Sequence, residues 1–399
     1  MQSRFKVSVA IAAICALAAA GCGSSKKSTA TTASGTPAAG GGACTSASGA
    51  TGPGVGSTTV GFIYVGSTKD YGYNEAAHDG STFLGQQCTN LKVLEADQIP
   101  ETSDMTRIAE DMISKGAKII FSTSYGYKDY AVALAAKHPD VAVLQQGNLI
   151  TPPVPANANT YFGNIYETVY LAGIAAGKAT KTNKLGFIAA FPIPQTLLNI
   201  DAFELGAQSV NPAAQTYTVF TGSWCDPAKQ SDAANSLLGQ GADILTQHQD
   251  CTGTVIKTAE AKGAFSVGYH FDAETLAPKG WLTGSEWRWG PLYVAMVKNI
   301  LAGQFSGGQF NNNYTLGFSS TTIPTPMVLA PYGPGVTSDT QSLIDTTKQK
   351  ILGGWSPFTG PVVDQSGKVQ VPAGASATND QLSKLSYLVK GVVGTLPSK

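Results

Sequence analysis

The sequence predicts an α/β protein with two doubly wound lobes, and three observations support this fold class. Short apolar runs alternate with longer helical stretches, a pattern typical of parallel sheets with crossover helices. The alternation occurs twice, once before and once after Tyr161-Phe162-Gly163. The folded part begins near Thr58 and spans roughly 340 residues, which is about the size of two domains.

The elements of each series follow from this pattern. The first series begins with the apolar strand Val60-Gly61-Phe62-Ile63-Tyr64-Val65. Helices are predicted after it at residues 74–88, 104–115 and 131–137, and strands at 91–96, 118–121 and 141–144. The second series predicts helices at residues 165–179, 196–209, 227–238 and 255–262, and strands at 184–190, 216–221, 243–247 and 265–269.

The N-terminus has the pattern of an exported lipoprotein. Arg4 and Lys6 precede an apolar run at residues 7–20, which is too short to cross a bilayer as a stable helix. Small residues then lead to Cys22, so we expect residues 1–21 to be a lipoprotein signal peptide and Cys22 to carry the lipid. An ordinary signal peptide with a chance cysteine is the alternative. The mature chain should be anchored at the outer face of the cytoplasmic membrane.

Composition predicts a tether and argues against one class of partner. Residues 22–57 are almost wholly Gly, Ser, Thr, Ala and Pro, and we expect them to form a flexible linker. The chain has 26 basic and 26 acidic residues, and removal of Arg4 and Lys6 would leave a net charge near −2. Nothing in this balance suggests a basic surface for nucleic acid.

The cysteines that remain after export predict disulfides. They are even in number, as expected of a framework outside the cytoplasm, and allow three pairings: Cys44, Cys88, Cys225 and Cys251. Cys225 and Cys251 each follow a predicted strand, and those strand ends would be neighbours in a parallel sheet. We therefore favour Cys225–Cys251, with Cys44–Cys88 as the second pair and free thiols as the alternative. No spacing of Cys and His suggests zinc, and we expect no metal or cofactor.

The ends of the predicted strands share a chemistry. In doubly wound sheets, ligands bind beyond the carboxyl ends of the strands. Nearly every such end carries an aromatic ring, an amide or a carboxylate, with Tyr125 and Asp250 among them. Rings hold a flat ligand by its faces, whereas amides and carboxylates satisfy the donors and acceptors at its edge. The recurrence predicts a planar ligand with a polar edge, although any single ring could be structural.

An enzyme and a sensor or interaction protein are the alternatives to a ligand-binding protein. His248 with Asp250, and His270 with Asp272, could form a metal or acid–base cluster at adjacent strand ends. No nucleophile elbow, P-loop or H-E-x-x-H motif accompanies them, so we do not expect an enzyme. An extracytoplasmic sensor or a surface interaction protein of the same fold is the other alternative.

A set of short motifs occurs in order between residues 59 and 396. They include Asp70-Tyr71-Gly72-Tyr73, Ser122-Thr123-Ser124-Tyr125-Gly126, Tyr161-Phe162-Gly163, Phe191-Pro192-Ile193-Pro194, Trp224-Cys225-Asp226-Pro227 and Pro357-Phe358-Thr359-Gly360-Pro361. These motifs resemble the basic membrane protein (BMP) family, lipoproteins that bind purine nucleosides and related bases for ABC transporters. The resemblance implies a ligand-binding role, with an ABC permease and its ATPase as partners of a monomeric protein.

The resemblance also implies a type I periplasmic-binding-protein fold, in which a hinge joins two doubly wound lobes and the ligand lies in the cleft. The N-terminal lobe would comprise residues 58–164 and be completed by 287–304. The C-terminal lobe would comprise residues 165–286 and be completed by 305–399. Closure of the lobes on the ligand would be the mechanism of capture.

Family roles carried onto matching positions give specific expectations. In the N-terminal lobe, Tyr73 would stack on the purine and Asn74 would reach its edge. Asp129 would accept a hydrogen bond from a ring N–H. From the C-terminal lobe, Phe191 and Trp224 would close the cleft.

Two further positions, Asp272 and Trp287, concern the ribose that a nucleoside carries and a free base lacks. Asp272 matches the carboxylate that binds ribose hydroxyls in nucleoside binders. Those members have a lysine near the position of Trp287, and an indole there would remove a sugar contact and fill space. The resemblance therefore favours a free base such as adenine or hypoxanthine over a nucleoside.

Overall fold

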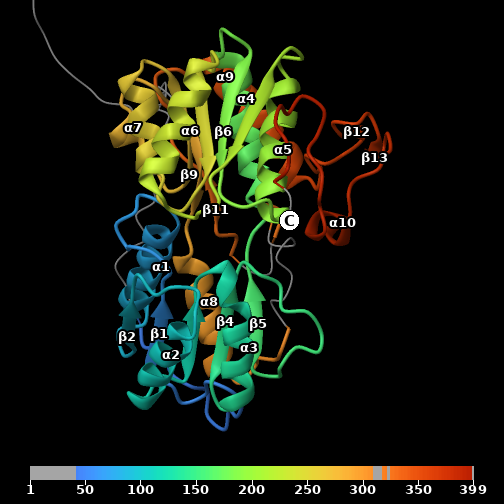
Figure 1. The fold of residues 1–399 in the computed structure, drawn as a ribbon. Helices are drawn as coiled ribbons and strands as arrows, with labels where there is room; N and C mark the ends of the chain where they lie inside the picture. The colour runs from blue at the N-terminus through green and yellow to red at the C-terminus, as the bar shows by residue number, and fades with distance from the viewer. Residues whose placement is uncertain (1–41, 309–316, 321–323, 398–399) are drawn as a thin grey trace, which may run out of the picture. The chain divides into compact units, whose positions relative to one another are not determined.

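The computed structural model describes residues 42–308, 317–320 and 324–397 (Figure 1). The predicted signal peptide at residues 1–21, the lipidation site Cys22 and residues 22–41 of the predicted linker lie outside these ranges. Within the ranges, no helix combines the length and apolar character needed to cross a membrane.

The N-terminal lobe is built on a parallel five-stranded sheet in the order β2-β1-β3-β4-β5. Its strands are β1 (Thr59–Ile63), β2 (Lys92–Ala96), β3 (Ile119–Ser122), β4 (Ala142–Gln146) and β5 (Ala158–Tyr161). Its helices are α1 (Tyr73–Gln87), α2 (Asp104–Ser114), α3 (Lys128–Lys137) and, from much later in the chain, α8 (Gly290–Leu301). Helix α8 packs against α1, so one side of the sheet is covered by two helices distant in sequence.

Aromatic rings fill the core on the α8 side of this sheet. Phe62 of β1 and Phe121 of β3 are register partners, and their rings stack with centroids 4.5 Å apart. Tyr293 of α8 packs on both rings at 5.2 and 4.8 Å. Burial of rings this large contributes strongly to stability, which anchors α8 to the N-terminal lobe.

The C-terminal lobe is built on a six-stranded sheet in the order β11-β10-β9-β8-β6-β7, parallel except for β11. The strands are β6 (Lys184–Ala189), β7 (Gln215–Phe220), β8 (Ile244–His248), β9 (Phe265–His270), β10 (Trp281–Trp287) and β11 (Met327–Leu329). The helices are α4 (Tyr166–Ala179), α5 (Pro194–Gln208), α6 (Pro227–Gly239), α7 (Gly253–Ala261) and α9 (Ser338–Leu352). The predicted α/β fold with two parallel sheets is confirmed.

Helices α4 and α5 lie unusually close together, and glycine makes this possible. A Cβ at Gly173 of α4 would lie 2.3 Å from the carbonyl oxygen of Phe203 in α5. A Cβ at Gly206 of α5 would lie 2.1 Å from the carbonyl oxygen of Tyr170 in α4. The two backbones touch where these glycines face each other, and both helices are almost wholly buried.

The chain passes between the two sheets more than once. It leaves β5 for α4 through residues 162–165, leaves β10 for α8 through 288–289, and later returns to β11 beside β10. Several crossing segments are what a hinge between two lobes requires. The lobe boundaries, an N-terminal lobe of residues 58–164 with 287–304 and a C-terminal lobe of 165–286 with 305–399, stay a prediction.

The C-terminal segment, red in Figure 1, forms a small layer against the C-terminal lobe. It contains β12 (Val362–Val363), β13 (Val369–Val371) and α10 (Asn379–Ser383). The Val389 N–H donates to the buried carboxylate of Asp201 in α5 at 2.9 Å. Burial raises the pKa of Asp201 well above its usual range.

Residues 42–57 correct the predicted linker, because they pack on the N-terminal lobe. Cys44 is buried and forms a disulfide with Cys88 at the end of α1. The Gly54 N–H donates to the carbonyl of Asp140 at 2.8 Å, and the Ala47 N–H to that of Leu301 at 3.1 Å. Composition alone missed this order because the disulfide and main-chain hydrogen bonds, rather than apolar side chains, hold the segment.

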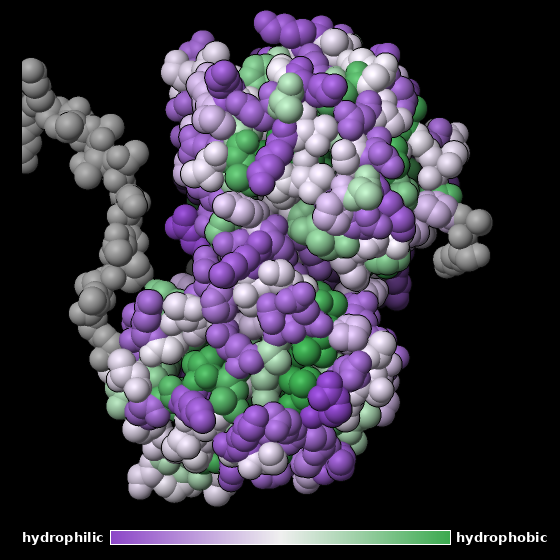
Figure 2. Space-filling model, turned by 60° about the vertical axis from the view of Figure 1, so that its left-hand side comes forward, coloured by the Kyte–Doolittle hydropathy of each residue, from purple (hydrophilic) through white to green (hydrophobic). Residues whose placement is uncertain are grey.

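Figure 2 shows one face of the molecule, where hydrophobic residues form separate groups among hydrophilic ones. Among the described residues, the large hydrophobic side chains that are exposed are Tyr71, Leu352, Val369 and Val393. Isolated residues of this kind are normal on a protein surface.

Candidate functional site

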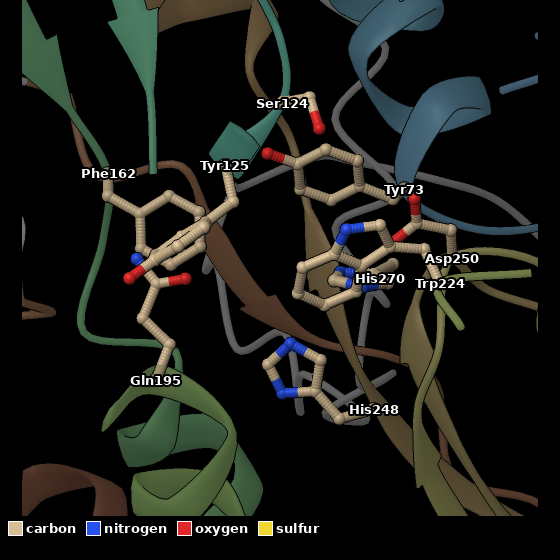
Figure 3. Close-up of a pocket in the computed structure, with 9 residues that line it drawn as sticks. All are labelled: Tyr73, Ser124, Tyr125, Phe162, Gln195, Trp224, His248, Asp250 and His270. Atoms are coloured by element: carbon tan, nitrogen blue, oxygen red, sulfur yellow. The ribbon is translucent and has the colours of Figure 1, made fainter. Parts of the chain in front are cut away.

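A pocket with an empty volume of about 310 Å³ lies at the carboxyl ends of the strands of both sheets. This figure includes space open to solvent, and the part of the pocket that can hold the centre of a water molecule is only about 20 Å³. Figure 3 shows the side chains that line it, which come from both lobes: Tyr73, Ser124, Tyr125, Phe162, Gln195, Trp224, His248, Asp250 and His270.

Tyr73 enters the pocket from the first residue of α1, and Asp70 organises the loop before it. The Asp70 carboxylate accepts from the N–H groups of Gly72, Asn74 and Glu75 at 2.9, 3.1 and 3.0 Å. Such a carboxylate satisfies helix N–H groups that have no partner within the helix. Burial nevertheless raises the pKa of Asp70 to about 6. The hydrogen bonds accepted by Asp70 fix this loop, and they hold the Tyr73 side chain at one position in the cleft.

Ser124 and Tyr125 follow β3 and are held by a carboxylate from another loop. Glu101 accepts from the Ser124 hydroxyl at 2.5 Å and from the Gly126 N–H at 2.7 Å. The ring of Tyr125 faces that of Trp224 across the pocket, with centroids 6.4 Å apart. Two rings on opposite lobes can therefore contact the same ligand.

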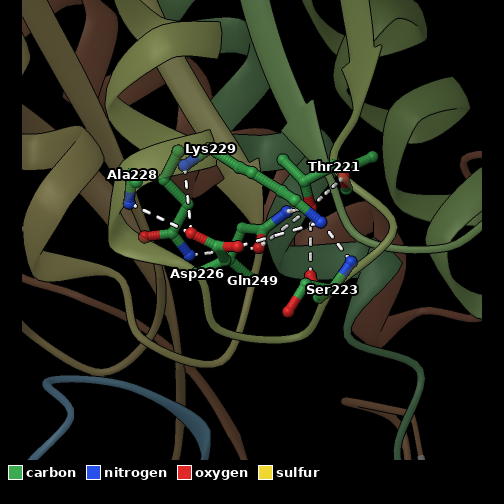
Figure 4. A network of polar contacts seen from close by, with 8 residues as sticks. Thr221, Ser223, Asp226, Ala228, Lys229 and Gln249 are labelled. Atoms are coloured by element: carbon green, nitrogen blue, oxygen red, sulfur yellow. Dashed lines mark hydrogen bonds and ion pairs between the residues drawn. The ribbon is translucent and has the colours of Figure 1, made fainter.

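The loop that carries Trp224 is fixed by a polar network (Figure 4). Asp226 caps α6 by accepting from the N–H groups of Ala228 and Lys229, both at 3.1 Å. The Gln249 amide donates to the Thr221 hydroxyl at 3.0 Å, which joins this loop to the one that follows β8.

Two further links join the loops of Trp224 and Asp250. The Asp250 N–H donates to the Trp224 carbonyl at 2.7 Å. The next residue of each loop forms the Cys225–Cys251 disulfide, the pairing predicted from the sequence, although the strands before these loops are not neighbours because β6 lies between β7 and β8. Trp224 and Asp250 therefore form one rigid part of the pocket wall.

Two histidines at the ends of β8 and β9 are held in the neutral form. The Asn199 amide lies 3.0 Å from Nδ1 of His248, and the Trp287 indole N–H donates to Nδ1 of His270 at 2.8 Å. Burial lowers the pKa of His248 to about 3. Burial, with a contribution from His248, also lowers the pKa of His270 well below its usual range.

Asp250 is the acidic group of the pocket. Burial, and then the nearby carboxylates of Asp70 and Glu101, raise the pKa of Asp250 well above its usual range. A ligand N–H that hydrogen-bonds this carboxylate would favour its ionised form. Stacking rings, neutral imidazoles and one carboxyl group suit a small planar molecule with donors and acceptors at its edge.

The two lobes touch at the mouth of the pocket through hydrogen bonds whose acceptors are main-chain carbonyls. The Tyr73 N–H donates to the Asp250 carbonyl at 3.1 Å. A hydroxyl of Thr252 donates to the Tyr71 carbonyl, and the Gln195 amide donates to the Gly147 carbonyl. A Cβ on Gly72 would lie 1.7 Å from the Asp250 carbonyl oxygen. These contacts hold the lobes in a closed arrangement.

Residues 57–316 match the model of a family described as PnrA-like substrate-binding proteins of ABC transporters. The chain belongs to this family. It is 33% identical over 343 residues to a purine-binding protein of Brucella abortus, a match that covers 85% of this chain and 93% of the other. It is 28% identical to a putative ABC transporter glucose-binding protein of Haloferax volcanii, over 87% of this chain and 83% of that one.

Solved structures agree with the fold. A solute-binding protein of an ABC transporter system from Conexibacter woesei superposes with a TM-score of 0.60. It is 20% identical, and the match covers 75% of this chain and 98% of that one. The type I periplasmic-binding fold implied by the sequence is thus confirmed. The family description is that of a substrate-binding component of an ABC transporter.

Of the nine ligand residues predicted for this PnrA-like protein, the structure brings four to the pocket: Tyr73, Tyr125, Trp224 and Asp250. Three others lie behind the pocket wall. Asn74 is buried, with its amide bonded to Asp70 at 2.8 Å and to the Gly66 N–H at 3.0 Å. Phe191 contacts Trp224 edge to face at 4.9 Å. Trp287 supports Phe162 and His270.

Asp129 and Asp272 are corrections to the predicted site. Asp129 lies in the first turn of α3, where its side chain is 90% exposed and 3.7 Å from the Lys128 ammonium. Asp272 accepts from the Glu274 N–H at 3.1 Å and lies two residues before the short turn η2 (Glu274–Leu276). Neither is among the described residues that line the pocket.

Sequence reasoning did not assign five lining residues to the ligand: Ser124, Phe162, Gln195, His248 and His270. All of them follow or end a strand, except Gln195, which lies in the first turn of α5. The concentration of polar and aromatic residues at strand ends was the signal that could have found most of them.

Proposed function

We propose that this PnrA-like protein captures a free purine base, such as adenine or hypoxanthine, and delivers it to an ABC permease whose ATPase is a separate chain. The observation that carries the proposal is the small pocket between Tyr73, Tyr125 and Trp224, with Asp250 and two neutral histidines at its edge. The similarity to the Brucella abortus purine-binding protein supports the same ligand class.

The free base is favoured over the nucleoside by the geometry around the pocket. The pocket is narrow, with only about 20 Å³ open to the centre of a water molecule, which favours the smaller of the two ligands. Asp272, the expected partner of ribose hydroxyls, accepts from the Glu274 N–H instead and does not line the pocket. Trp287 packs on Phe162 behind the pocket wall, so the preference for a free base does not rest on this residue.

Titration calorimetry tests this proposal. We expect adenine or hypoxanthine to bind with a dissociation constant of about 1 μM or below, equivalent to about −8 kcal/mol. Adenosine and guanosine should bind at least about tenfold more weakly, and glucose should give no heat. Nucleosides that bind tenfold more tightly than any base would reject the preference for free bases. No binding by any purine would reject the proposed ligand class, and heat from glucose alone would point to a sugar carrier.

We also propose that a lipid on Cys22 anchors the protein to the membrane, because small residues precede this cysteine at the end of an apolar run. Cys22→Ser should abolish partition into the detergent phase in a Triton X-114 separation. A matched Ser24→Ala variant, two residues further along, should partition like the wild type. Unchanged partition of Cys22→Ser would contradict the anchor.

A further inference from the structure

The contact between Trp287 and His270 fixes which ring nitrogen of His270 carries a proton. An indole N–H can only donate a hydrogen bond, so Nδ1 of His270 must accept it at 2.8 Å. A neutral imidazole whose Nδ1 accepts carries its hydrogen on Nε2. The indole thus holds His270 in one tautomer, with Nε2 as the donor.

That donor has no partner among the described residues. Nε2 of His270 is buried, and no hydrogen bond to it exists within the described part of the chain. The side chain is 1% exposed and lines the pocket. A buried N–H without a partner is costly, so a ligand that supplies an acceptor there gains binding free energy that other ligands do not.

We propose that His270 is a specificity-determining residue that donates from Nε2 to an unprotonated ring nitrogen of the purine, and that Trp287 is the positioning residue that fixes this tautomer. The inference rests on the proposed function and names the feature of the ligand that the site selects. Trp287 is suited to this task because its ring is itself held between Trp289 and Phe162, at 4.4 and 4.8 Å.

The surroundings of His270 favour the neutral donor. The groups that face it are Tyr73 at 5.0 Å, His248 at 5.8 Å and Tyr269 at 3.8 Å between ring centroids. None of these three rings carries a negative charge that would stabilise an imidazolium. Burial lowers the pKa of His270, in keeping with a neutral ring. Because Nδ1 of the neutral ring is occupied as an acceptor, His270 can offer the ligand only the N–H donor at Nε2.

Binding of deaza analogues tests the role of His270. In each analogue a C–H replaces one ring nitrogen with little change of shape, and an acceptor is lost in every case except 1-deazahypoxanthine, because N1 of hypoxanthine carries a hydrogen and donates. With wild-type protein, at least one of the 1-, 3- and 7-deaza analogues of the bound base should bind about tenfold more weakly than the base. In His270→Phe this difference should fall below about threefold, because the donor is gone.

Trp287→Phe tests the positioning role and has a matched control. Nitrogen-15 NMR of the histidine rings in the ligand-free protein should show the Nε2–H tautomer of His270 in the wild type and a mixture in Trp287→Phe. The deaza difference should shrink in Trp287→Phe as well. Trp355→Phe removes an indole that contacts Tyr170 at 5.5 Å and does not line the pocket, so it should retain both the tautomer and the difference.

Each outcome decides a separate claim. A wild type that binds all deaza analogues as tightly as the base, or a difference that persists in His270→Phe, would overturn the role of His270. An unchanged tautomer in Trp287→Phe would overturn the role of Trp287. If no purine base binds at all, the proposed function fails together with the ligand role of His270, while the NMR spectrum still decides the role of Trp287.

Discussion

Gly72→Ala should weaken ligand binding by about a hundredfold while leaving the ligand-free protein folded. The added Cβ would lie 1.7 Å from the Asp250 carbonyl oxygen, far inside van der Waals contact. This carbonyl belongs to the opposite lobe and accepts from the Tyr73 N–H, so both sides of the collision are main chain. The open arrangement should escape the clash because the lobes are apart there. Calorimetry gives the affinity, and small-angle scattering with saturating ligand shows whether the lobes still close.

The matched control for this variant is Gly239→Ala at the end of α6, where a Cβ would meet open space. It should bind like the wild type. If Gly72→Ala binds within about threefold of the wild type and compacts on adding ligand, the contact at Gly72 does not form part of closure.

Replacing both Cys225 and Cys251 with serine should lower the free energy of unfolding of the C-terminal lobe by about 3–4 kcal/mol. The bond closes a loop with a sequence separation of 26 residues, which sets this magnitude in the chain-entropy account. Affinity should fall too, because Trp224 and Asp250 each adjoin one end of the bond. Thermal unfolding and calorimetry measure the two effects.

The double variant of Cys44 and Cys88 is the control. It removes a disulfide of the N-terminal lobe with a separation of 44 residues, away from the pocket lining. It should destabilise the protein but bind ligand normally once folded. Non-reducing peptide maps that show free Cys225 and Cys251 thiols in the wild type would contradict the prediction, and so would equal affinities of the two double variants.

Much of the fold could be predicted from the sequence because its signals are local. An apolar run such as Val60–Val65 identifies a strand by itself, and the order of strands and helices then implies parallel sheets. Strand β10 (Trp281–Trp287) was missed because Thr283-Gly284-Ser285 interrupts its apolar character. A Cβ at Gly284 would lie 2.8 Å from Gly268 of β9, so the polar, small sequence reflects close strand packing.

The site was predictable only in part because it depends on pairs of residues that the sequence separates. Asp129 and Asp250 both follow predicted strands, but the pattern does not show that Asp129 faces solvent from a helix turn. The link between His270 and Trp287 depends on the pairing of β9 with β10, where His270 opposes Glu286. A resemblance to a family shows which positions of the sequence correspond. The direction in which each side chain points depends on how strands such as β9 and β10 pair in the folded protein.

The main-chain contacts between the lobes at Gly72 and Asp250 bear on how this protein can change over evolution or by engineering. One contact of closure joins the Tyr73 N–H to the Asp250 carbonyl, groups that every non-proline residue supplies, beside a single glycine. Lining side chains that form no hydrogen bond between the lobes can therefore be exchanged without removing this contact. A library varied at Ser124 and Tyr125 would keep the closure contacts, including that of Gln195, while altering the cargo, which makes this chain a promising scaffold for biosensors of small planar molecules.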